Sequence, residues 1–366
     1  MRIPAWIEFK QGMVEQVVGK IDETTIILKL AIDHVCKLAV LYPRLTGPAD
    51  IGDRVLVNTT ASSLGLGTGG YHFVVCNLDR PATPFESRGH GMKLKYTPFQ
   101  VQLLLSEEEE SPHHPYYDQP VDFRNKLVYI GELHSMLVPL CACIKYFSGS
   151  SVRIAFIMTD HGALPVGFSR NVALLKDKGL LDVTITSGNA FGGDHECVNI
   201  YTSLKAALDI EGCQTAVITM GPGILGTGTT YGFSGLELGL YANLIAGLGG
   251  NVVYVPRLGF GDSRRRHRGI SHHSITVLRD IVQHSLPLVL PLMDAKSRIR
   301  IMEQLKENGL LDKHRIIFLD GADVRAALDH YSLRPTTMGR GLDEDPYFFY
   351  TLGAASRYGL PKITAL

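Results

Sequence analysis

The feature that most constrains the fold is a regular alternation of short β runs and helical patterns from about residue 126 onward. At least seven runs rich in Val, Ile, Leu and Phe are each followed by a segment with helical periodicity. A last helix is expected after Asp345-Pro346, because proline suits the first helical position. Parallel strands need crossover connections, which are usually helices. We therefore expect residues 123–366 to form a doubly wound, mostly parallel, Rossmann-like α/β domain.

Residues 1–105 show a different pattern, in which short β runs follow one another with Gly, Asp and Pro between them. The runs are GMVEQVVGKI, TTIILKLA, HVCKLAVLYP, DRVLVNTT and YHFVVCNL. This spacing predicts a small antiparallel β-barrel-like domain. Residues 106–122 contain four consecutive glutamates and three prolines, so a linker or a solvent-exposed excursion is expected there.

Composition restricts the location and the partners of the chain. Lys+Arg and Asp+Glu both number 36 among 366 residues, so no net charge recruits nucleic acid or a membrane surface, and neither is expected as a partner. The N-terminus lacks a signal-peptide pattern, and the apolar runs are shorter than the ~20 residues that cross a bilayer. Six cysteines without CxxC spacing indicate buried free thiols, and we expect a cytoplasmic protein. The sequence leaves homo-oligomerisation open.

Polar residues are concentrated in the loops that should follow the strands of the α/β domain. Ligands of open α/β sheets bind outside the carboxyl ends of the strands, where helix N-termini and loop amides gather. The expected strand-to-helix loops contain many of the glycines, histidines and acids, whereas the helix-to-strand turns are plain. The sequence therefore predicts a ligand site at this edge.

The richest of these loops is GPGILGTGTTYGFSG, residues 221–235. Its glycines would let backbone amides approach an anion, and its hydroxyls could bind the anion or cap the next helix. The candidate anion- or cofactor-binding residues here are Gly221, Gly223, Gly226, Thr227, Gly228, Thr229, Thr230 and Ser234. The loop is no Walker A motif, and Tyr231 stands where a dinucleotide fingerprint needs its third glycine. A tight connection with glycines for packing is the alternative.

The next loop is basic and ends in a pair of histidines. Arg257 and Arg268 are candidate anion clamps, although a solvated basic loop is the ordinary reading of such a run. Ser271 is a candidate cap for a helix that has His272 and His273 in its first turn. The helix dipole disfavours imidazolium there, so a neutral histidine could act as a base, a ligand or a packed core residue.

Two further loops contribute acids and histidines. Asp160, His161, Asp194 and His195 could supply a carboxylate–imidazole pair for proton transfer, and Asp160 is the first choice of acid. If a divalent metal is present, we expect its ligands among Asp160, Asp194, His195 and His273, although no HxxxH or HxH spacing supports one. Cys197 is expected to be packed on a helix.

The β-domain could also send side chains toward the ligand. His90, Lys93 and Lys95 are the candidates, and simple exposure at the surface is preferred for them.

Taken together, these motifs resemble an uncharacterised bacterial family classified as a domain of unknown function. The resemblance rests on LTGP, GLGTGGYHFV, GHGMKLKYTP, SPHH, TDHGALP, AFGGDHE, MGPGI, GFSG, SHH and TMGRG, and it spans nearly the whole chain. It implies a bacterial cytoplasmic setting and no established activity, cofactor or catalytic residue.

Three functional hypotheses follow from the residues. The first is an enzyme, a hydrolase or transferase, that acts on a small anionic substrate such as a phosphate ester or nucleotide. The second is an NADP-dependent reductase with Gly226 and Gly228 under the pyrophosphate and Arg257 near a 2′-phosphate. The third is a non-catalytic sensor whose α/β domain binds a metabolite while the barrel contacts a partner.

Overall fold

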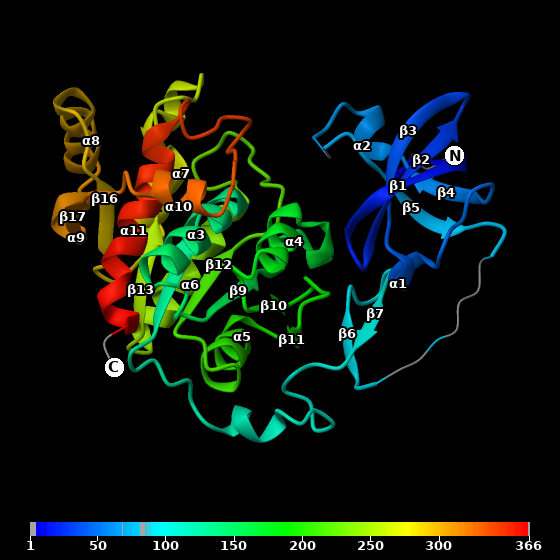
Figure 1. Cartoon of the computed structure of the whole chain (residues 1–366), viewed down its shortest axis with the longest axis horizontal. Helices are drawn as coiled ribbons and strands as arrows, with labels where there is room; N and C mark the ends of the chain where they lie inside the picture. The colour runs from blue at the N-terminus through cyan, green and yellow to red at the C-terminus, as the bar shows by residue number, and fades with distance from the viewer. Residues whose placement is uncertain (1–4, 68, 81–84, 86–87, 365–366) are drawn as a thin grey trace. The chain divides into compact units, whose positions relative to one another are not determined.

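The structure is a computed structural model that describes residues 5–67, 69–80, 85 and 88–364. The chain forms two compact units (Figure 1). Unit 1 comprises Met1–Arg88, Leu94–Leu103 and Gly167–Ala173, and unit 2 comprises Gly89–Lys93, Leu104–Val166 and Leu174–Leu366.

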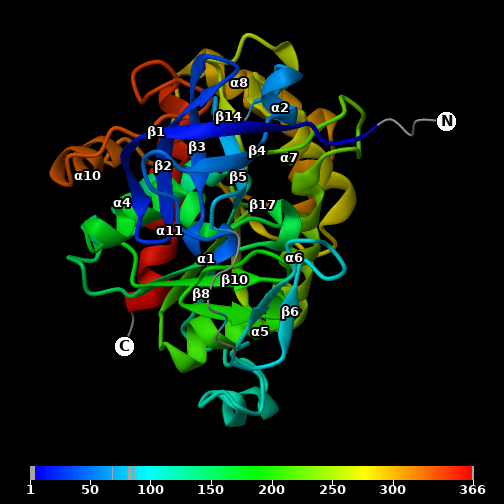
Figure 2. The same cartoon turned by 90° about the vertical axis from the view of Figure 1, so that its right-hand side faces the viewer.

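Unit 1 contains a closed five-stranded barrel with the strand order β1-β2-β3-β5-β4 (Figure 2). Its elements are β1 (Phe9–Asp22), β2 (Thr25–Ile32), β3 (Val35–Leu41), α1 (Pro43–Thr46), β4 (Arg54–Asn58), α2 (Thr60–Ser63), β5 (His72–Asn77) and, outside the barrel, β7 (Val101–Leu103). Each of the five sequence runs forms one barrel strand, so the barrel prediction is confirmed. The β3–β5 pair is parallel, whereas the other barrel pairs are antiparallel.

The barrel closes over a core of aliphatic side chains. Successive side chains of a strand point to opposite faces, so every second residue faces the interior. Leu28 and Leu30 of β2 and Val55 and Val57 of β4 follow this pattern and are fully buried. The sequence runs are recognised by their content of Val, Ile, Leu and Thr and by the turn residues between them, and this pattern of burial explains why those side chains are apolar.

Unit 2 is built around a parallel sheet of six strands with the order β11-β10-β9-β12-β8-β13. The strands are β8 (Leu127–Gly131), β9 (Ile154–Met158), β10 (Val183–Ser187), β11 (His195–Cys197), β12 (Thr215–Thr219) and β13 (Asn251–Val255). Every residue of β8, β9, β10 and β12 is buried, as expected for parallel strands that are covered on both faces.

Helices cover both faces of this sheet. The α-helices that follow β8 along the chain are α3 (Leu137–Phe147), α4 (Arg170–Asp177), α5 (Ile200–Lys205), α6 (Glu237–Gly247), α7 (His272–Thr276), α8 (Ala295–Glu307), α9 (Leu310–Lys313), α10 (Val324–His330) and α11 (Pro346–Thr364), and the first half of α4 belongs to unit 1. One core cluster joins Val128 and Ile130 of β8 to side chains of α5 and α6. On the other face α11 lies so close that a Cβ on Gly359 would be 1.9 Å from the Tyr129 hydroxyl oxygen.

The order in which successive strands are added to the sheet reverses between β9 and β12. From β9 the chain continues to β10 on one side, whereas from β12 it continues to β13 on the other side. Such a switch point opens a crevice at the carboxyl ends of the strands, where ligands of open α/β sheets bind. The order differs from that of the dinucleotide-binding Rossmann fold.

Two features of unit 2 differ from the expectations. The last two β runs, β16 (Pro287–Pro291) and β17 (Arg315–Leu319), form a separate two-stranded parallel sheet. Cys197, expected on a helix, ends the edge strand β11, because Asn199 accepts hydrogen bonds from Tyr201 N and Thr202 N and thereby starts α5 after the strand.

Residues 106–122 follow an ordered path with one 3₁₀ turn, His114–Asp118. Ser106 donates its backbone N–H to Glu196 O, and Val198 N donates to a carboxylate oxygen of Glu107 at 2.7 Å. Glu109 and Glu110 are exposed, as expected for an acidic run, whereas Glu107 is partly buried. Among the described residues, no helix is both long and apolar enough to cross a membrane.

Candidate functional site

Four neighbouring strands of unit 2, β9, β12, β8 and β13, end beside one another, and we call this line of ends the carboxyl edge. Thr159 follows β9, Gly221 lies two residues after β12, Glu132 follows β8 and Arg257 lies two residues after β13. Thr159, Glu132 and Arg257 are buried although they are polar, so their hydrogen-bond partners determine what the edge can do.

An acid cluster lies at the switch point between β9 and β12. The Thr159 hydroxyl donates to Glu237 Oε1 at 2.5 Å, and the Tyr241 hydroxyl donates to Glu237 Oε2 at 3.3 Å. Burial raises the pKa of Glu237, although the Thr159 hydrogen bond and nearby His161 counteract the rise. Asp160 belongs to the same cluster, since its charge also raises the Glu237 pKa. Two carboxyl groups in different environments are suited to exchanging protons with a substrate.

Asp160 is held by the loop that follows β10. Asn189 N donates to Asp160 Oδ1 at 2.6 Å. Gly188 has φ +63°, and a Cβ at this position would lie 2.5 Å from Asp160 Cγ. Only glycine therefore lets the loop approach the carboxylate this closely.

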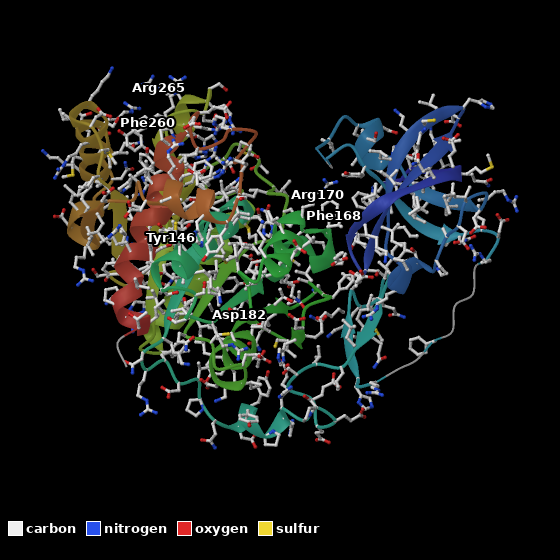
Figure 3. The ribbon with its side chains drawn as sticks, in the orientation of Figure 1. Tyr146, Phe168, Arg170, Asp182, Phe260 and Arg265 are labelled. Carbon is white, nitrogen blue, oxygen red and sulfur yellow. The ribbon has the colours of Figure 1, made fainter. Side chains whose placement is uncertain are left out.

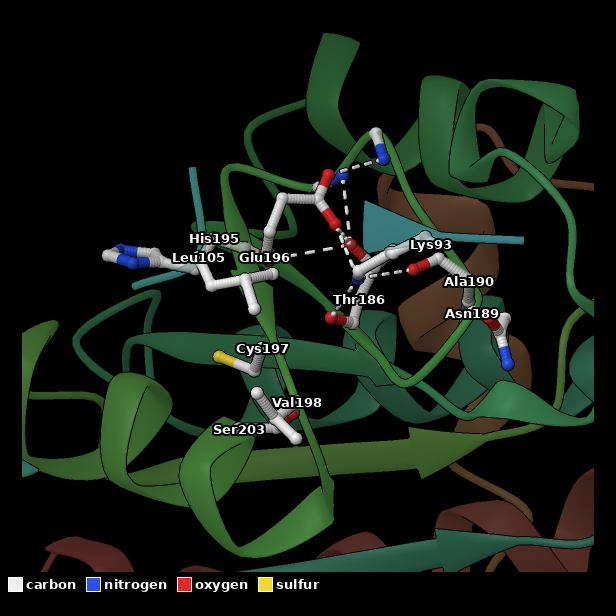
Figure 4. Close-up of polar contacts among 12 residues, drawn as sticks. Lys93, Leu105, Thr186, Asn189, Ala190, His195, Glu196, Cys197, Val198 and Ser203 are labelled. Carbon is white, nitrogen blue, oxygen red and sulfur yellow. Dashed lines mark hydrogen bonds and ion pairs between the residues drawn. The ribbon is translucent and has the colours of Figure 1, made fainter. Parts of the chain in front are cut away.

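A buried ion pair fixes the far part of the same loop (Figure 4). The Lys93 ammonium donates to Glu196 Oε2 at 2.7 Å and to Ala190 O at 2.6 Å. Glu196 also accepts from Gly192 N at 2.6 Å and from the Thr186 hydroxyl at 2.7 Å. Lys93 was expected at the surface, but it is 3% exposed and satisfies the loop carbonyl and the carboxylate.

A histidine cluster, His267, His272 and His273, lies beyond β13. The rings of His272 and His273 are 4.1 Å apart between centroids, and His267 is 5.0 Å from His272. His273 also stacks on Phe233 at 4.0 Å. Burial lowers the pKa of His273 to about 4 and that of His267 to about 3, with further lowering by Arg257. The cluster is therefore uncharged near neutral pH.

Ser271 orients this cluster. Its hydroxyl accepts from His273 N and so caps α7, and it lies 2.9 Å from His267 Nδ1. His272 Nε2 is buried and has no hydrogen-bond partner among the described residues. A buried nitrogen without a partner carries a desolvation cost that a ligand could remove.

Glu132 and Arg257 tie the ends of β8 and β13 together. Glu132 is 3% exposed and accepts hydrogen bonds from the Ser274 hydroxyl and, at 3.1 Å, from Arg257 N. Burial raises the Glu132 pKa, so this carboxyl resists ionisation. The Arg257 guanidinium binds Asp262 at 2.6 Å. Its charge is thus already paired inside the loop.

The remaining arginines of the basic loop differ in their contacts. Arg268 donates its Nε–H to Asp262 O at 2.8 Å, so it also supports the loop. Arg265, labelled in Figure 3, and Arg266 are exposed and pair with no carboxylate in the part of the chain that the structure describes. Arg266 also donates its Nε–H to His267 Nε2 at 3.5 Å, which places it beside the histidine cluster.

The glycine loop forms an exposed hairpin. Thr227 N donates to Gly232 O at 2.9 Å, and the Thr229 hydroxyl accepts from Gly232 N at 3.0 Å. Gly223, Gly228 and Thr230 lie on the exposed part of this hairpin, and the Ser234 hydroxyl bonds to the backbone of Leu225. The predicted threonine hydroxyls are therefore partly used within the loop itself.

The same loop connects the two clusters. A Cβ on Gly221 would lie 3.0 Å from the Leu164 side chain, which comes from the loop after β9. A Cβ on Gly226 would lie 3.8 Å from His273 Cε1. The structure thus brings Gly226 next to His273, while Gly221 lies on the side of Asp160.

Other predicted residues make contacts elsewhere. Asp194 binds the Lys176 ammonium at 2.8 Å, and His195 Nε2 lies 2.7 Å from Glu211 Oε1. His90 is exposed and lies 3.5 Å from Glu110, and Lys95 is exposed. Among the described residues no three His, Cys, Asp or Glu side chains form a group that could hold a metal ion. Asp160, Asp194, His195 and His273 are accordingly not gathered into one site.

Sequence reasoning missed two carboxyl groups of the edge. Glu132 follows the β8 run directly in YIGELHS, which is the position where a strand delivers a side chain to the edge. Glu237 stands in the first turn of α6, where an acid is common because it favours the helix dipole, so nothing marked it as unusual.

Comparison with known proteins adds a family but no activity. A family model described as a protein of unknown function, DUF3866, matches residues 38–356. No curated protein and no solved structure matches the chain.

Proposed function

The chain belongs to the DUF3866 family of proteins of unknown function, and we propose that unit 2 is an enzyme that binds a small anionic ligand at the carboxyl edge. The reaction class is hydrolysis or group transfer, in which a proton must be delivered and another removed. A phosphate ester or a nucleotide is the favoured type of substrate.

One observation carries the proposal: several groups with shifted pKa values lie along this edge. Burial raises the pKa of Glu132 and Glu237, and burial lowers that of His272 and His273. These groups follow three different strands, and the strand order places the ends of β12, β8 and β13 beside one another. Such clusters are typical of sites that move protons.

The two ends of the carboxyl edge have different roles in this proposal, anion binding at the histidine cluster and proton transfer at the acid cluster. Arg265 and Arg266 near the neutral histidine cluster offer positive charge and hydrogen-bond donors for the anionic group of the ligand. Glu237, with its raised pKa, is suited to donate a proton, and Asp160 is suited to accept one. The glycine loop lies between these groups and supplies backbone amides.

We also propose that unit 2 is a doubly wound sheet of the Rossmann-like type, since helices cover both faces and the order of strand addition reverses between β9 and β12. A cytoplasmic location is supported by the free cysteines among the described residues. Nucleic acid and membrane remain unexpected as partners because the net charge is zero.

An NADP-dependent reductase is the weaker alternative, because the strand order differs from that of the dinucleotide-binding fold and Arg257 is already paired with Asp262. A metabolite sensor would use the same anion end without proton transfer. The two alternatives differ from the enzyme in their response to NADPH and to loss of the acids.

The test is a thermal-shift screen of inorganic phosphate, sugar phosphates, nucleotides and NADPH on the full chain. A ligand at a hundredfold excess over its dissociation constant raises the free energy of unfolding by about 2.7 kcal/mol. We expect Arg266→Ala to weaken the shift and Arg300→Ala, which removes an exposed arginine of α8, to leave it unchanged.

Turnover of the ligand that binds then separates an enzyme from a sensor. Asp160→Asn and Glu237→Gln should keep most of the thermal shift and lose turnover. Absence of a shift from every anion would refute anion binding, and turnover that survives both substitutions would refute the assigned roles.

A further inference from the structure

The barrel of unit 1 has a pocket of about 300 Å³ at one mouth. Its lining residues, between Lys10 and His72, belong to a different part of the sequence from the candidate site of unit 2. The lining includes Ile32 and His72 at the floor and Lys10, Lys37, Thr59 and Ser63 around them. Mouths of β-barrels are common places for small-molecule sites, and this volume suits a small metabolite.

His72 lines this pocket with a buried imidazole. It stands two residues before the core residue Val74 in β5, so both side chains point to the same side of the strand, the barrel interior. His72 is 5% exposed, and its Nδ1 is buried without a hydrogen-bond partner among the described residues. Burial, assisted by Lys37 and Lys10, lowers the pKa of His72, so the ring is neutral and can donate one hydrogen bond.

Two cations, Lys10 and Lys37, line the pocket together with one carboxylate, Asp33, and a second carboxylate, Glu8, lies nearby. Lys10 binds Asp33 at 2.8 Å. Glu8, close to the rim, accepts hydrogen bonds from the hydroxyls of Thr59 and Ser63. Lys37 is exposed, lines the pocket and pairs with no carboxylate within the described ranges.

The structure assigns this pocket as a second ligand site, and we propose that it binds a small anion through a carboxylate or phosphate group. The Lys37 ammonium pairs with the anion, and the His72 imidazole donates a hydrogen bond to one of its oxygens. Such charge-assisted contacts are stronger than those between neutral groups. The site lies in unit 1, so it is independent of the function proposed for unit 2.

The experiment follows the ring nitrogens of His72 by nuclear magnetic resonance in the full chain labelled with ¹⁵N-histidine. The His72 signals are assigned as those missing from His72→Gln. Acetate and inorganic phosphate are titrated separately, so that the two kinds of anionic group are distinguished, and ethylammonium chloride serves as a cationic probe.

We expect saturable movement of the His72 signals with acetate, phosphate or both, and none with ethylammonium. Lys37→Met should weaken this binding about tenfold or more, as expected when an ion pair is lost. Lys20→Met serves as the control, because Lys20 is an exposed lysine of β1 that does not line the pocket. This substitution should leave the binding unchanged. Arg266→Ala in unit 2 should also leave it unchanged.

The proposed ligand site is refuted if neither anion moves the His72 signals, or if the Lys37→Met variant binds the anion as well as the Lys20→Met variant does. Lys37 is exposed, so its substitution is compatible with folding even if His72→Gln proves unstable. In that case the His72 signals are assigned as the ones that respond to Lys37→Met.

Discussion

Replacing Lys93 with methionine should destabilise unit 2 more than any loss of a surface ion pair. Lys93 and Glu196 have side chains that are 3% and 10% exposed, and the ammonium also binds the Ala190 carbonyl. Lys93→Met leaves the buried carboxylate without its counter-charge, and removing one partner of a buried pair costs about 3–5 kcal/mol. The loss should appear as a lower urea midpoint for the unfolding of unit 2, measured by circular dichroism.

The control is Lys176→Met. Lys176 pairs with Asp194 at 2.8 Å, close to the 2.7 Å of the Lys93–Glu196 pair, but the two side chains are 40% and 45% exposed. Such an exposed pair contributes about 0–1 kcal/mol.

A second substitution tests the cause. Glu196→Gln removes the buried charge and keeps an oxygen that can accept from Gly192 N and the Thr186 hydroxyl. Lys93→Met combined with Glu196→Gln should therefore be more stable than Lys93→Met alone, by a coupling of about 0.5–3 kcal/mol. The reasoning is refuted if Lys93→Met costs no more than Lys176→Met, or if the double variant recovers nothing.

Three further outcomes are expected. Burial lowers the pKa of His134 to about 4 from an ordinary 6.5, so folding opposes its protonation. The free energy of unfolding should keep the full His134 contribution above pH 6.5 and fall by about 3 kcal/mol as the pH is lowered to 4. His134→Gln should reduce this loss, measured by urea unfolding at a series of pH values. Gly188→Ala should abolish turnover, because the added Cβ would displace Asp160. Gly179→Ala, at φ +64° with open space around its Cβ, should retain turnover and lose only about 1–2 kcal/mol of stability through backbone strain. Ser271→Ala should cost about 1 kcal/mol through the lost cap of α7, measured by thermal unfolding.

Much of the fold could be predicted because burial leaves a periodic trace in the sequence. Strands β2 and β4 of the barrel largely alternate in burial, and β8, β9, β10 and β12 of unit 2 are buried throughout because helices cover both faces of the sheet. The pairing of β16 with β17 in a separate sheet could not be predicted, because both runs look like any other buried parallel strand.

The candidate site was predicted less completely. The sequence indicated the loops at the carboxyl ends, and the structure places Gly226 beside His273. It did not indicate that Arg257 would bind Asp262, because a residue five positions away along an irregular loop has no fixed direction. Nor did it reveal Glu132, whose partner Ser274 is 142 positions away in the chain.

The position of β8 within the sheet has a consequence for synthesis on the ribosome. β8 is the first strand of this sheet to be made, yet its neighbours are β12 and β13, with Leu127 opposite Thr215 and Asn251. Both of its edges stay open while the intervening chain is translated, whereas β9 and β10 can pair with each other earlier. Completion of the sheet centre must therefore wait for β13, and until then an apolar strand with two free edges is the segment most exposed to misassociation between nascent chains.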